Sequence, residues 1–386
     1  MKVCFVITSS ISVKTFYLGY LNFLKNHGLE VYVISNFSGN LLKVEELEML
    51  SFVDIDFSRG PNPFKDLIAL TKLTKNLKRI QPDILIYATP KASLLAAISG
   101  YILQIKVRVY QLWGLRAEGE FGLAKRLLIY FERLIFRLST VVTTVSQSLA
   151  EETQILNLGK RPLVIAKGSS HGVDLTNFNP SNTNVLVPEI YKELWGQNQQ
   201  LQFITLIGRL SHDKGVDVFL NMIAELKKEF PNSIGVLVGP IEDKKIALQI
   251  NQEISNGNVV WVNFTEDIRG YLRFATINCL PTLREGLPNI VLESSALGTP
   301  SVTTNATGAI DSVIDGVTGF IVKKSDSKDL LKATKQLLND PSLRSKMSIE
   351  GINFVSQNFS SEFVWNSHLS FLQSLALNKR VAHDYQ

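Results

Sequence analysis

The chain contains little cysteine. Only two of its 386 residues are cysteines, Cys4 and Cys279, and each lies inside an apolar, strand-like run. This pattern gives no support to a disulfide framework or to a cysteine-based metal site. It predicts a protein of the reducing cytoplasm.

Long apolar runs are also missing. An uncharged and mainly apolar stretch of 14 residues, 92–105, includes serine, glycine and glutamine. It is too short and too polar to span a bilayer, so it predicts a buried helix that leads into a strand. The apolar run after Lys2 ends at Thr8 and predicts a first buried strand rather than a signal peptide.

Charged residues make up only 19% of the chain, against 45% apolar residues, which is typical of a well-packed globular protein. Lys and Arg outnumber Asp and Glu over residues 1–176 (21 against 14), whereas the acids lead over residues 177–386 (21 against 19). The basic first half is expected to face an anionic membrane surface or a phosphorylated acceptor. No nucleic-acid partner is expected, because basic patches interleaved with aromatic residues are missing.

Short apolar runs alternate with helical patterns along the whole chain, which predicts an α/β protein with parallel sheets. The predicted strands of a first domain, residues 1–176, are 3–8, 31–35, 52–57, 84–88, 107–111, 141–145 and 163–166. Those of a second Rossmann-like domain, residues 201–360, are 203–207, 234–238, 259–263, 277–280, 301–304 and 320–323. Residues 177–200 are predicted to form a linker, in which 190–195 can form a short helix. Residues 361–386 are predicted to form a helix that packs back towards the first domain.

Two acids around a turn mark the strongest candidate site. Glu285 and Glu293 are separated by seven residues that begin with Gly286, Leu287 and Pro288. Glu285 is predicted to lie in a loop and Glu293 in the helix that follows it. Carboxylates suit ligand hydroxyls, and the amides at the start of a helix suit anions. The alternative is two ordinary surface acids, one capping the helix and one solvated.

A second candidate is the loop 208–215, which directly follows a predicted strand. Its cations, Arg209 and Lys214, are therefore expected at the carboxyl edge of the second sheet, where they can clamp a diphosphate. His212 in the same loop is interpreted as a polar filler rather than a catalytic acid. The alternative for the cations is a solvated loop.

These residues belong to a series of motifs in a fixed order. The series is Gly208-Arg209-Leu210 with Lys214-Gly215, then Glu285 with Glu293, then Gly298-Thr299-Pro300, then Asp315-Gly316-Val317-Thr318-Gly319-Phe320. It resembles the motif set of family 4 glycosyltransferases, which have the GT-B fold, two Rossmann-like domains facing a central cleft. His171-Gly172-Val173-Asp174 is similar to the family's Asn-Gly-Val-Asp, with His in place of Asn.

The resemblance implies a retaining transfer of a sugar from a nucleotide-sugar donor. It implies that Gly208, Arg209 and Lys214 bind the donor diphosphate. Glu285, with the amides of Gly286 and Leu287, would hold the sugar, and Glu293 the ribose. Fixed cations would stabilise the departing diphosphate, so neither a metal ion nor another cofactor is expected.

One motif competes with this reading. Asp54-Ile55-Asp56 has the Asp-x-Asp form that binds a divalent ion in the other large glycosyltransferase fold. Its acids alternate with apolar residues, however, which favours a half-exposed strand over a metal site.

The acceptor side is less clearly marked. Thr8-Ser9-Ser10 stands where family members carry a Gly-Gly loop, and His27 resembles a helix end rather than a catalytic group. The loops 57–63 and 113–119 resemble the subset that builds bacterial capsule, O-antigen and other surface polysaccharides. Their candidate acceptor residues are Arg59, Trp113, Arg116 and Glu118. Loop-stabilising salt links are the alternative for the charged members.

The predicted helix 123–138 carries Arg126, Arg133 and Arg137 on one stripe among apolar residues. Such a helix can lie on an anionic membrane near a lipid-linked acceptor, or it can simply cover the core with a solvated face. The sequence thus predicts a metal-independent hexosyltransferase at the inner face of the cell membrane, using a UDP-sugar and a lipid-linked saccharide. A GT-B sugar-nucleotide epimerase and a non-catalytic nucleotide-sugar-binding subunit are the alternatives.

Overall fold

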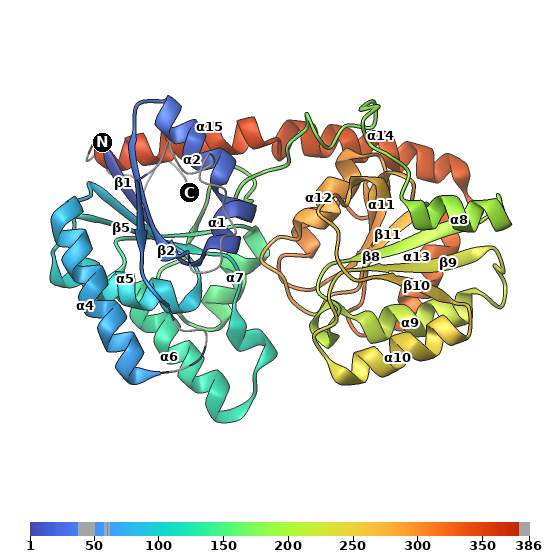
Figure 1. Cartoon of the computed structure of the whole chain (residues 1–386), viewed down its shortest axis with the longest axis horizontal. Helices are drawn as coiled ribbons and strands as arrows, with labels where there is room; N and C mark the ends of the chain where they lie inside the picture. The colour runs from blue at the N-terminus through green and yellow to red at the C-terminus, as the bar shows by residue number, and fades with distance from the viewer. Residues whose placement is uncertain (38–50, 58–59, 61, 378–386) are drawn as a thin grey trace. The chain divides into compact units, whose positions relative to one another are not determined.

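A computed structural model describes residues 1–37, 51–57, 60 and 62–377 of the chain (Figure 1). The chain divides into two compact units. The first unit comprises Met1–His171 together with Glu362–Gln386, and the second comprises Gly172–Ser361. Each unit contains one parallel sheet with helices on both faces, as the alternation of strands and helices predicts.

The first sheet has the strand order β3-β2-β1-β4-β5-β6-β7, and all paired strands are parallel. Its strands are β1 (Lys2–Ser9), β2 (Glu30–Asn36), β3 (Ser51–Asp54), β4 (Ile84–Tyr87), β5 (Val107–Leu112), β6 (Val141–Thr144) and β7 (Leu163–Val164). Each of the seven predicted strands is present. Val3 pairs with Val31 on one side and with Ile84 on the other, so β1 lies in the middle of the sheet.

Alternate residues of these strands face two different helical layers. Phe5 and Ile7 of β1 pack with residues of α1 (Ser10–Phe16), α2 (Leu18–Asn26) and α15 (Ser361–Ala376) in one core. In Figure 1 the helices α4 (Pro63–Ile80), α5 (Pro90–Ile102) and α6 (Gly122–Leu138) lie on the other side of the sheet, and α5 contacts both α4 and α6. The unit also contains η1 (Arg116–Gly119) and α7 (Gln147–Ile155).

The last helix, α15, completes the core of the first unit. Leu369, Phe371, Leu372 and Leu375 are buried there with residues of β1 and α2. Trp365 lies against Gly19, where a Cβ atom would come within 2.8 Å of the indole ring. The end of the described chain thus packs on its beginning.

The second sheet is also parallel, with the order β10-β9-β8-β11-β12-β13. Its strands are β8 (Gln202–Ile207), β9 (Ser233–Val238), β10 (Val259–Val262), β11 (Ile277–Leu280), β12 (Ser301–Thr304) and β13 (Gly319–Val322). One face is covered by α9 (Val216–Leu226), α10 (Lys244–Ser255) and α13 (Ser327–Asn339). The other face is covered by α8 (Glu189–Gln197), α11 (Arg269–Arg273), α12 (Asn289–Ala296) and α14 (Pro341–Asn358).

Residues 177–200 do not form a free linker; they pack within the second unit. Tyr191 of α8 is fully buried, and its ring stacks on Phe203 of β8 with a centroid distance of 3.9 Å. One helical turn later, the Nε1–H group of Trp195 donates a hydrogen bond to the Leu201 carbonyl at 3.1 Å. The Asn-rich and Pro-rich composition indicates turns, but aromatic residues four apart place one helix face on the sheet.

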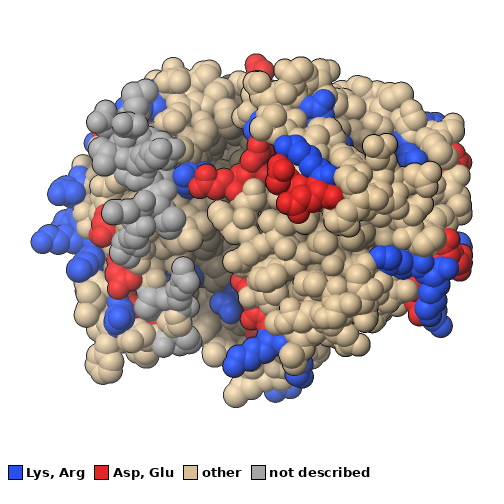
Figure 2. All heavy atoms as spheres, turned by 45° about the vertical axis from the view of Figure 1, so that its right-hand side comes forward, with Lys and Arg blue, Asp and Glu red and all other residues tan. Residues whose placement is uncertain are grey.

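Charged side chains are sparse on the surface. Figure 2 shows one face of the molecule, on which Lys, Arg, Asp and Glu form small groups within a mainly uncharged surface. Within the described ranges, no helix combines the length and the apolar content that crossing a membrane requires.

The first unit buries one acid, Glu132, that forms no ion pair with a described residue. Glu132 of α6 is only 6% exposed, and the Tyr110 hydroxyl donates a hydrogen bond to its Oε2 at 2.9 Å. Burial raises the pKa of Glu132 to about 7, although the hydrogen bond from Tyr110 acts in the opposite direction. The folded chain therefore binds this proton more tightly than the unfolded chain does.

This buried acid makes the stability of the first unit depend on pH. Its contribution is complete below the unfolded pKa near 4.5 and is lost as the pH rises to about 7. The unfolding free energy should fall by about 3 kcal/mol over that range because of Glu132, and we expect Glu132→Gln to abolish this decrease. Urea unfolding at a series of pH values measures this, with exposed Glu151→Gln as the matched control. Identical pH profiles for wild type and Glu132→Gln would contradict the prediction.

Candidate functional site

Two loops of the second unit meet at the carboxyl edge of its sheet. One follows β8 and contains residues 208–215; the other follows β11 and contains residues 281–288. Strands β8 and β11 are neighbours, although β9 and β10 intervene in the sequence, so the strand order reverses between them. Ligands of parallel α/β sheets bind at such a switch point. The topology therefore brings together two loops that are some 70 residues apart.

The backbones of the two loops touch at a glycine. Gly215 has φ +71°, and a Cβ atom there would lie 1.9 Å from the Pro281 carbonyl oxygen. The Leu283 amide donates to the Asp213 carbonyl at 2.9 Å, and Thr282 Oγ1 donates to the same oxygen at 3.0 Å. Only glycine allows both the left-handed conformation and the close approach. These backbone contacts thus hold the two loops together.

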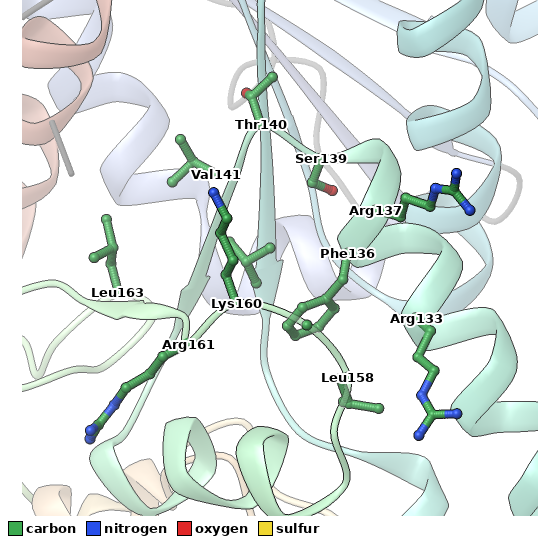
Figure 3. A pocket seen from close by; sticks show the side chains of 12 residues that line it. Arg133, Phe136, Arg137, Ser139, Thr140, Val141, Leu158, Lys160, Arg161 and Leu163 are labelled. Atoms are coloured by element: carbon green, nitrogen blue, oxygen red, sulfur yellow. The ribbon is translucent and has the colours of Figure 1, made fainter. Parts of the chain in front are cut away.

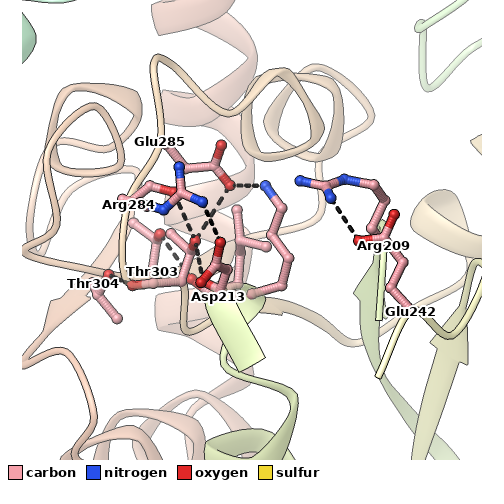
Figure 4. A network of polar contacts seen from close by, with 10 residues as sticks. Arg209, Asp213, Glu242, Arg284, Glu285, Thr303 and Thr304 are labelled. Carbon is pink, nitrogen blue, oxygen red and sulfur yellow. Dashed lines mark hydrogen bonds and ion pairs between the residues drawn. The ribbon is translucent and has the colours of Figure 1, made fainter. Parts of the chain in front are cut away.

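Lys214 and Glu285 form an ion pair between the two loops (Figure 4). Their side chains are only 18% and 14% exposed, and Thr282 Oγ1 lies 3.3 Å from Glu285 Oε1. The family resemblance implies separate roles for these residues, phosphate binding for Lys214 and hydroxyl binding for Glu285. Because they are in direct contact, any ligand that meets Lys214 also lies next to the carboxylate of Glu285.

A second ion pair, which the sequence does not predict, lies beside the first. Arg284 Nη2 donates to Asp213 Oδ2, so the residues preceding Glu285 and Lys214 also bind each other (Figure 4). The only signal in the sequence is their position next to predicted site residues. Because each pair joins the same two loops, the Asp213–Arg284 contact positions the Lys214–Glu285 contact.

Arg209 follows a glycine at the end of β8 and reaches the loop that follows β9. Its Nη1 donates to Glu242 Oε2 at 2.6 Å, and both side chains are well exposed. Figure 4 shows the guanidinium group of Arg209 on the side of the site that faces Glu285. Exposed pairs of this kind contribute little to stability, so Arg209 can exchange Glu242 for an anionic ligand at small cost.

Several buried polar atoms of this site have no hydrogen-bond partner within the described structure. They are Ser211 Oγ, Asp217 Oδ1 and Arg284 Nε. Buried polar groups are normally satisfied, so a group of orphan atoms at one sheet edge indicates a place where a ligand or water supplies the missing bonds.

The backbone of Glu285 and Gly286 is held by the loop after β12. The Glu285 amide donates to the Thr307 carbonyl at 2.9 Å, and a Cβ atom on Gly308 would lie 2.2 Å from the Gly286 carbonyl oxygen. Gly308 has φ +74°. The helix α12 begins three residues after Gly286, so Gly286 and Leu287 lie in its approach segment.

Glu293 lies in α12, as predicted, and Glu285 in the preceding loop. Glu293 has no basic residue within ion-pair distance in the described part of the chain, and burial raises its pKa to about 7. Glu285 has Lys214 as its partner. The two acids therefore have different environments and need not act as one acid/base pair.

The predicted acceptor residues belong to the first unit. Trp113 and the η1 turn, which contains Arg116 and Glu118, follow β5 at the carboxyl edge of the first sheet. Trp113 packs against Phe16, with ring centroids 5.3 Å apart. Arg116 is exposed and forms no ion pair with any described residue, so the salt-link alternative has no support for it. Arg59 lies outside the described residues.

The Asp-x-Asp motif lies at the end of β3, and its carboxylates bond within the protein. Asp54 Oδ1 accepts from the Phe37 amide and Asp56 Oδ1 from Asn36 Nδ2, both at 2.9 Å. Ile55 is buried between them, as in a half-exposed strand. The described ranges contain no cluster of His, Cys, Asp and Glu that could hold a metal ion.

The histidines considered in the sequence have structural surroundings. His27 caps the end of α2, as predicted. His212 is exposed, and its Nδ1 lies 3.2 Å from Asp217 Oδ2. His171 bonds Ser170 Oγ through Nδ1 at 2.7 Å, and burial lowers its pKa to about 4, so it is neutral at pH 7.

The architecture of two parallel α/β units matches solved nucleotide-sugar enzymes over the whole chain. The crystal structure of Alr3699/HepE from Anabaena in complex with UDP superposes with a TM-score of 0.76. It covers 97% of this chain and 100% of that chain, at 18% sequence identity. The fold class is therefore GT-B, which confirms the prediction.

Sequence comparisons define the family. Residues 189–354 match the model "Glycosyl transferases group 1", and residues 14–168 match "Glycosyltransferase Family 4". The capsular polysaccharide biosynthesis glycosyltransferase CapM of Staphylococcus aureus is 30% identical over 354 residues, 90% of each chain. A Campylobacter jejuni N,N'-diacetylbacillosaminyl-diphospho-undecaprenol α-1,3-N-acetylgalactosaminyltransferase is 26% identical, over 89% of this chain and 91% of its own. The chain belongs to the family 4 glycosyltransferases, as its motifs indicate.

The paired loops give a stability prediction. A double-mutant cycle with Asp213→Asn and Arg284→Met should show a coupling energy of about 1 kcal/mol, because the two side chains are half-buried and join two loops. The exposed pair Lys228–Glu225 serves as the control and should give about 0.3 kcal/mol. Urea unfolding of the four chains in each cycle measures both energies. Additive effects of Asp213→Asn and Arg284→Met would mean that the loops do not depend on this contact.

Proposed function

We propose that this glycosyltransferase moves a hexose-type sugar from a UDP-sugar to a lipid-linked saccharide, with retention of anomeric configuration, in surface polysaccharide biosynthesis. The observation that carries the proposal is the Lys214–Glu285 pair at the switch point of the second sheet, next to Arg209. A nucleotide sugar contains an anionic diphosphate linked directly to a sugar that carries several hydroxyl groups. This site places cations, which suit the diphosphate, next to a carboxylate, which suits the hydroxyls.

Each residue has a role that follows from its charge. Arg209 and Lys214 bind the diphosphate, with the Gly208 backbone beside it, and they stabilise the charge that develops as it leaves. Glu285 accepts hydrogen bonds from the sugar hydroxyls, helped by the amides of Gly286 and Leu287. Glu293 holds the ribose from α12. The orphan atoms Ser211 Oγ and Arg284 Nε support ligand contacts at the same edge.

The reaction exchanges one bond at the anomeric carbon for another. The bond to the diphosphate oxygen breaks, and the acceptor oxygen bonds to the same face of the sugar. The proton of the acceptor hydroxyl passes to the departing phosphate. Such same-face attack is what the family resemblance implies, and it needs no side chain in the role of acid or base. Glu285 and Lys214 act by orientation and by charge.

The donor and acceptor classes draw support from the relatives. The Anabaena structure contains UDP, and the name of the Campylobacter relative specifies a diphospho-undecaprenol acceptor and an α-1,3 linkage. CapM supports a role in capsule or related polysaccharide synthesis. Trp113, Arg116 and Glu118 are the proposed acceptor contacts in the first unit, and Arg59 is a further candidate.

We also place the enzyme at the cytoplasmic face of the membrane, held by α6. Leu123, Leu127 and Tyr130 are exposed on this helix, and Tyr130 is 62% exposed. Arg126, Arg133 and Arg137 accompany them on the exposed side. Exposed apolar residues flanked by arginines suit the boundary between lipid head groups and acyl chains better than they suit water.

The decisive experiment combines a donor screen with one substitution. We expect transfer from a UDP-sugar to extracted lipid-linked acceptors, read by mass spectrometry. Glu285→Gln should reduce turnover at least about 100-fold while the thermal midpoint hardly changes, because the carboxylate acts on the ligand. Glu253→Gln, on α10 away from the site, is the control.

The same assay separates the alternative functions. Appearance of an isomerised donor without transfer would instead favour an epimerase. UDP binding without any turnover would favour a binding subunit. Transfer at the wild-type rate by Glu285→Gln would contradict the assigned site.

A second prediction concerns metal ions. Because Arg209 and Lys214 supply positive charge to the diphosphate, turnover should persist when divalent ions are omitted and a chelator is added. Asp54→Asn and Asp56→Asn should likewise keep their activity, since both acids bond within the first unit. Loss of turnover with chelator, and its recovery on adding Mg²⁺ or Mn²⁺, would overturn metal independence.

A further inference from the structure

The first unit contains a basic pocket whose cavity has no role so far, although Arg133 and Arg137 of its lining also belong to the exposed side of α6. It has a volume of about 710 Å³ and lies where the end of α6, the start of β6 and the segment before β7 meet. In Figure 3, Arg133 and Arg137 stand on one side, Lys160 and Arg161 on the other, and Phe136 and Leu158 between them. The volume is in the range of known small-ligand sites.

This pocket lies at the opposite edge of the sheet from the proposed acceptor residues. Strand β6 begins at Val141, which lines the pocket, whereas Trp113 follows the carboxyl end of the neighbouring β5. A four-residue strand spans about 13 Å, so one small ligand cannot occupy both places. The pocket is therefore separate from the acceptor site.

The charge of the pocket is strongly one-sided. Four of its lining residues are cations, and none is an acid. Within the described chain, Lys160 and Arg137 have no carboxylate within ion-pair distance, and Arg161 reaches only Glu151 at 3.9 Å. Arg133 donates to the carbonyls of Asn157 and Leu156 at 2.9 and 3.1 Å, which fixes its guanidinium group. Uncompensated cations around a hollow attract an anion.

The other polar groups of the pocket are already committed to the protein. Ser139 Oγ donates to the Ile135 carbonyl at 2.6 Å and lies 2.7 Å from the Tyr87 hydroxyl. Thr140 Oγ1 donates to the Arg108 carbonyl at 3.1 Å. Phe136 and Leu158 form an apolar floor and are nearly buried. A ligand thus meets cations at the rim and hydrocarbon beneath, which suits a phosphate group attached to an apolar body.

We propose that this pocket binds a phosphate-bearing anion, and that its source is the head group of an anionic phospholipid. Arg133 and Arg137 are four residues apart on α6 and share the exposed side of the helix with Leu127 and Tyr130. The pocket therefore continues the helix face that we assign to the membrane. The choice of a lipid source rests on that part of the proposed function, whereas the phosphate chemistry follows from the pocket itself.

The test uses the full-length chain and a matched pair of double variants. Lys160→Glu with Arg161→Glu changes the pocket without altering α6, and Lys72→Glu with Lys75→Glu on α4 makes the same change in net charge elsewhere in the first unit. We expect the pocket variant to lose at least about tenfold in affinity for vesicles containing phosphatidylglycerol, and the control less than about threefold. Phosphatidylcholine vesicles should bind weakly in every case. Unchanged thermal midpoints would establish that both variants fold.

A second arm separates the two possible sources of phosphate. Inorganic pyrophosphate is titrated against the wild type and both variants by calorimetry, without vesicles and with UDP present to occupy the proposed donor site. Weak binding of pyrophosphate with selective loss of vesicle binding in the pocket variant supports the lipid source. A different result would assign the pocket to a soluble phosphate ligand. In that case pyrophosphate binds tightly, only the pocket variant loses this binding, and all three proteins bind vesicles equally. If the pocket variant and the control behave alike in both arms, the proposal is wrong.

Catalysis is measured separately so that the two proposals can fail independently. Donor hydrolysis by the soluble enzyme in the absence of vesicles should be the same in wild type and pocket variant. If the wild type shows no donor turnover but the selective loss of vesicle binding is found, the proposed function fails and the pocket assignment stands.

Discussion

The direct contact between Lys214 and Glu285 is the interaction on which the proposed donor site depends. Opposite charges that are largely shielded from water must be paired, so each side chain fixes the other. The contact exists because β8 and β11 are adjacent in the sheet, because Gly215 lets the two loops touch, and because Asp213 and Arg284 hold the same loops a second time. Arg209 has no such constraint and is bound only to an exposed acid.

Much of the fold could be predicted from the sequence, because fully buried parallel strands appear as short apolar runs. Every predicted strand is present, and the two acids of the donor motif lie in a loop and a helix as expected. The contacts between loops could not be predicted. Asp213 and Arg284 look like ordinary surface residues in the sequence, and Glu242 is 33 residues from Arg209. The order of the strands in the sheet brings these residues together, and strand order cannot be inferred from a local sequence pattern.

The segment 177–200 shows a different limit of sequence reasoning. Its composition is that of a linker, since Asn and Pro favour turns and break regular structure. Tyr191 nevertheless buries its ring on the second sheet, and the half-buried Trp195 packs against Phe203 beside it. Burial of these aromatic rings favours an ordered helix here. The pocket at the end of α6 was equally hidden, because Lys160 and Arg161 meet Arg133 and Arg137 only through the tertiary fold.

The return of α15 to the first unit has a consequence for the order in which the chain folds during synthesis. The core around β1 and α2 lacks Leu369, Phe371 and Leu372 until α15 has been synthesised, and every residue of the second unit is made before them. Although most of the first unit precedes the second in the sequence, its core can be completed only after the second unit has been made. A nascent chain therefore exposes apolar surface of its first unit while the whole second unit is synthesised, and chaperones that bind such surfaces have access to that region during this time.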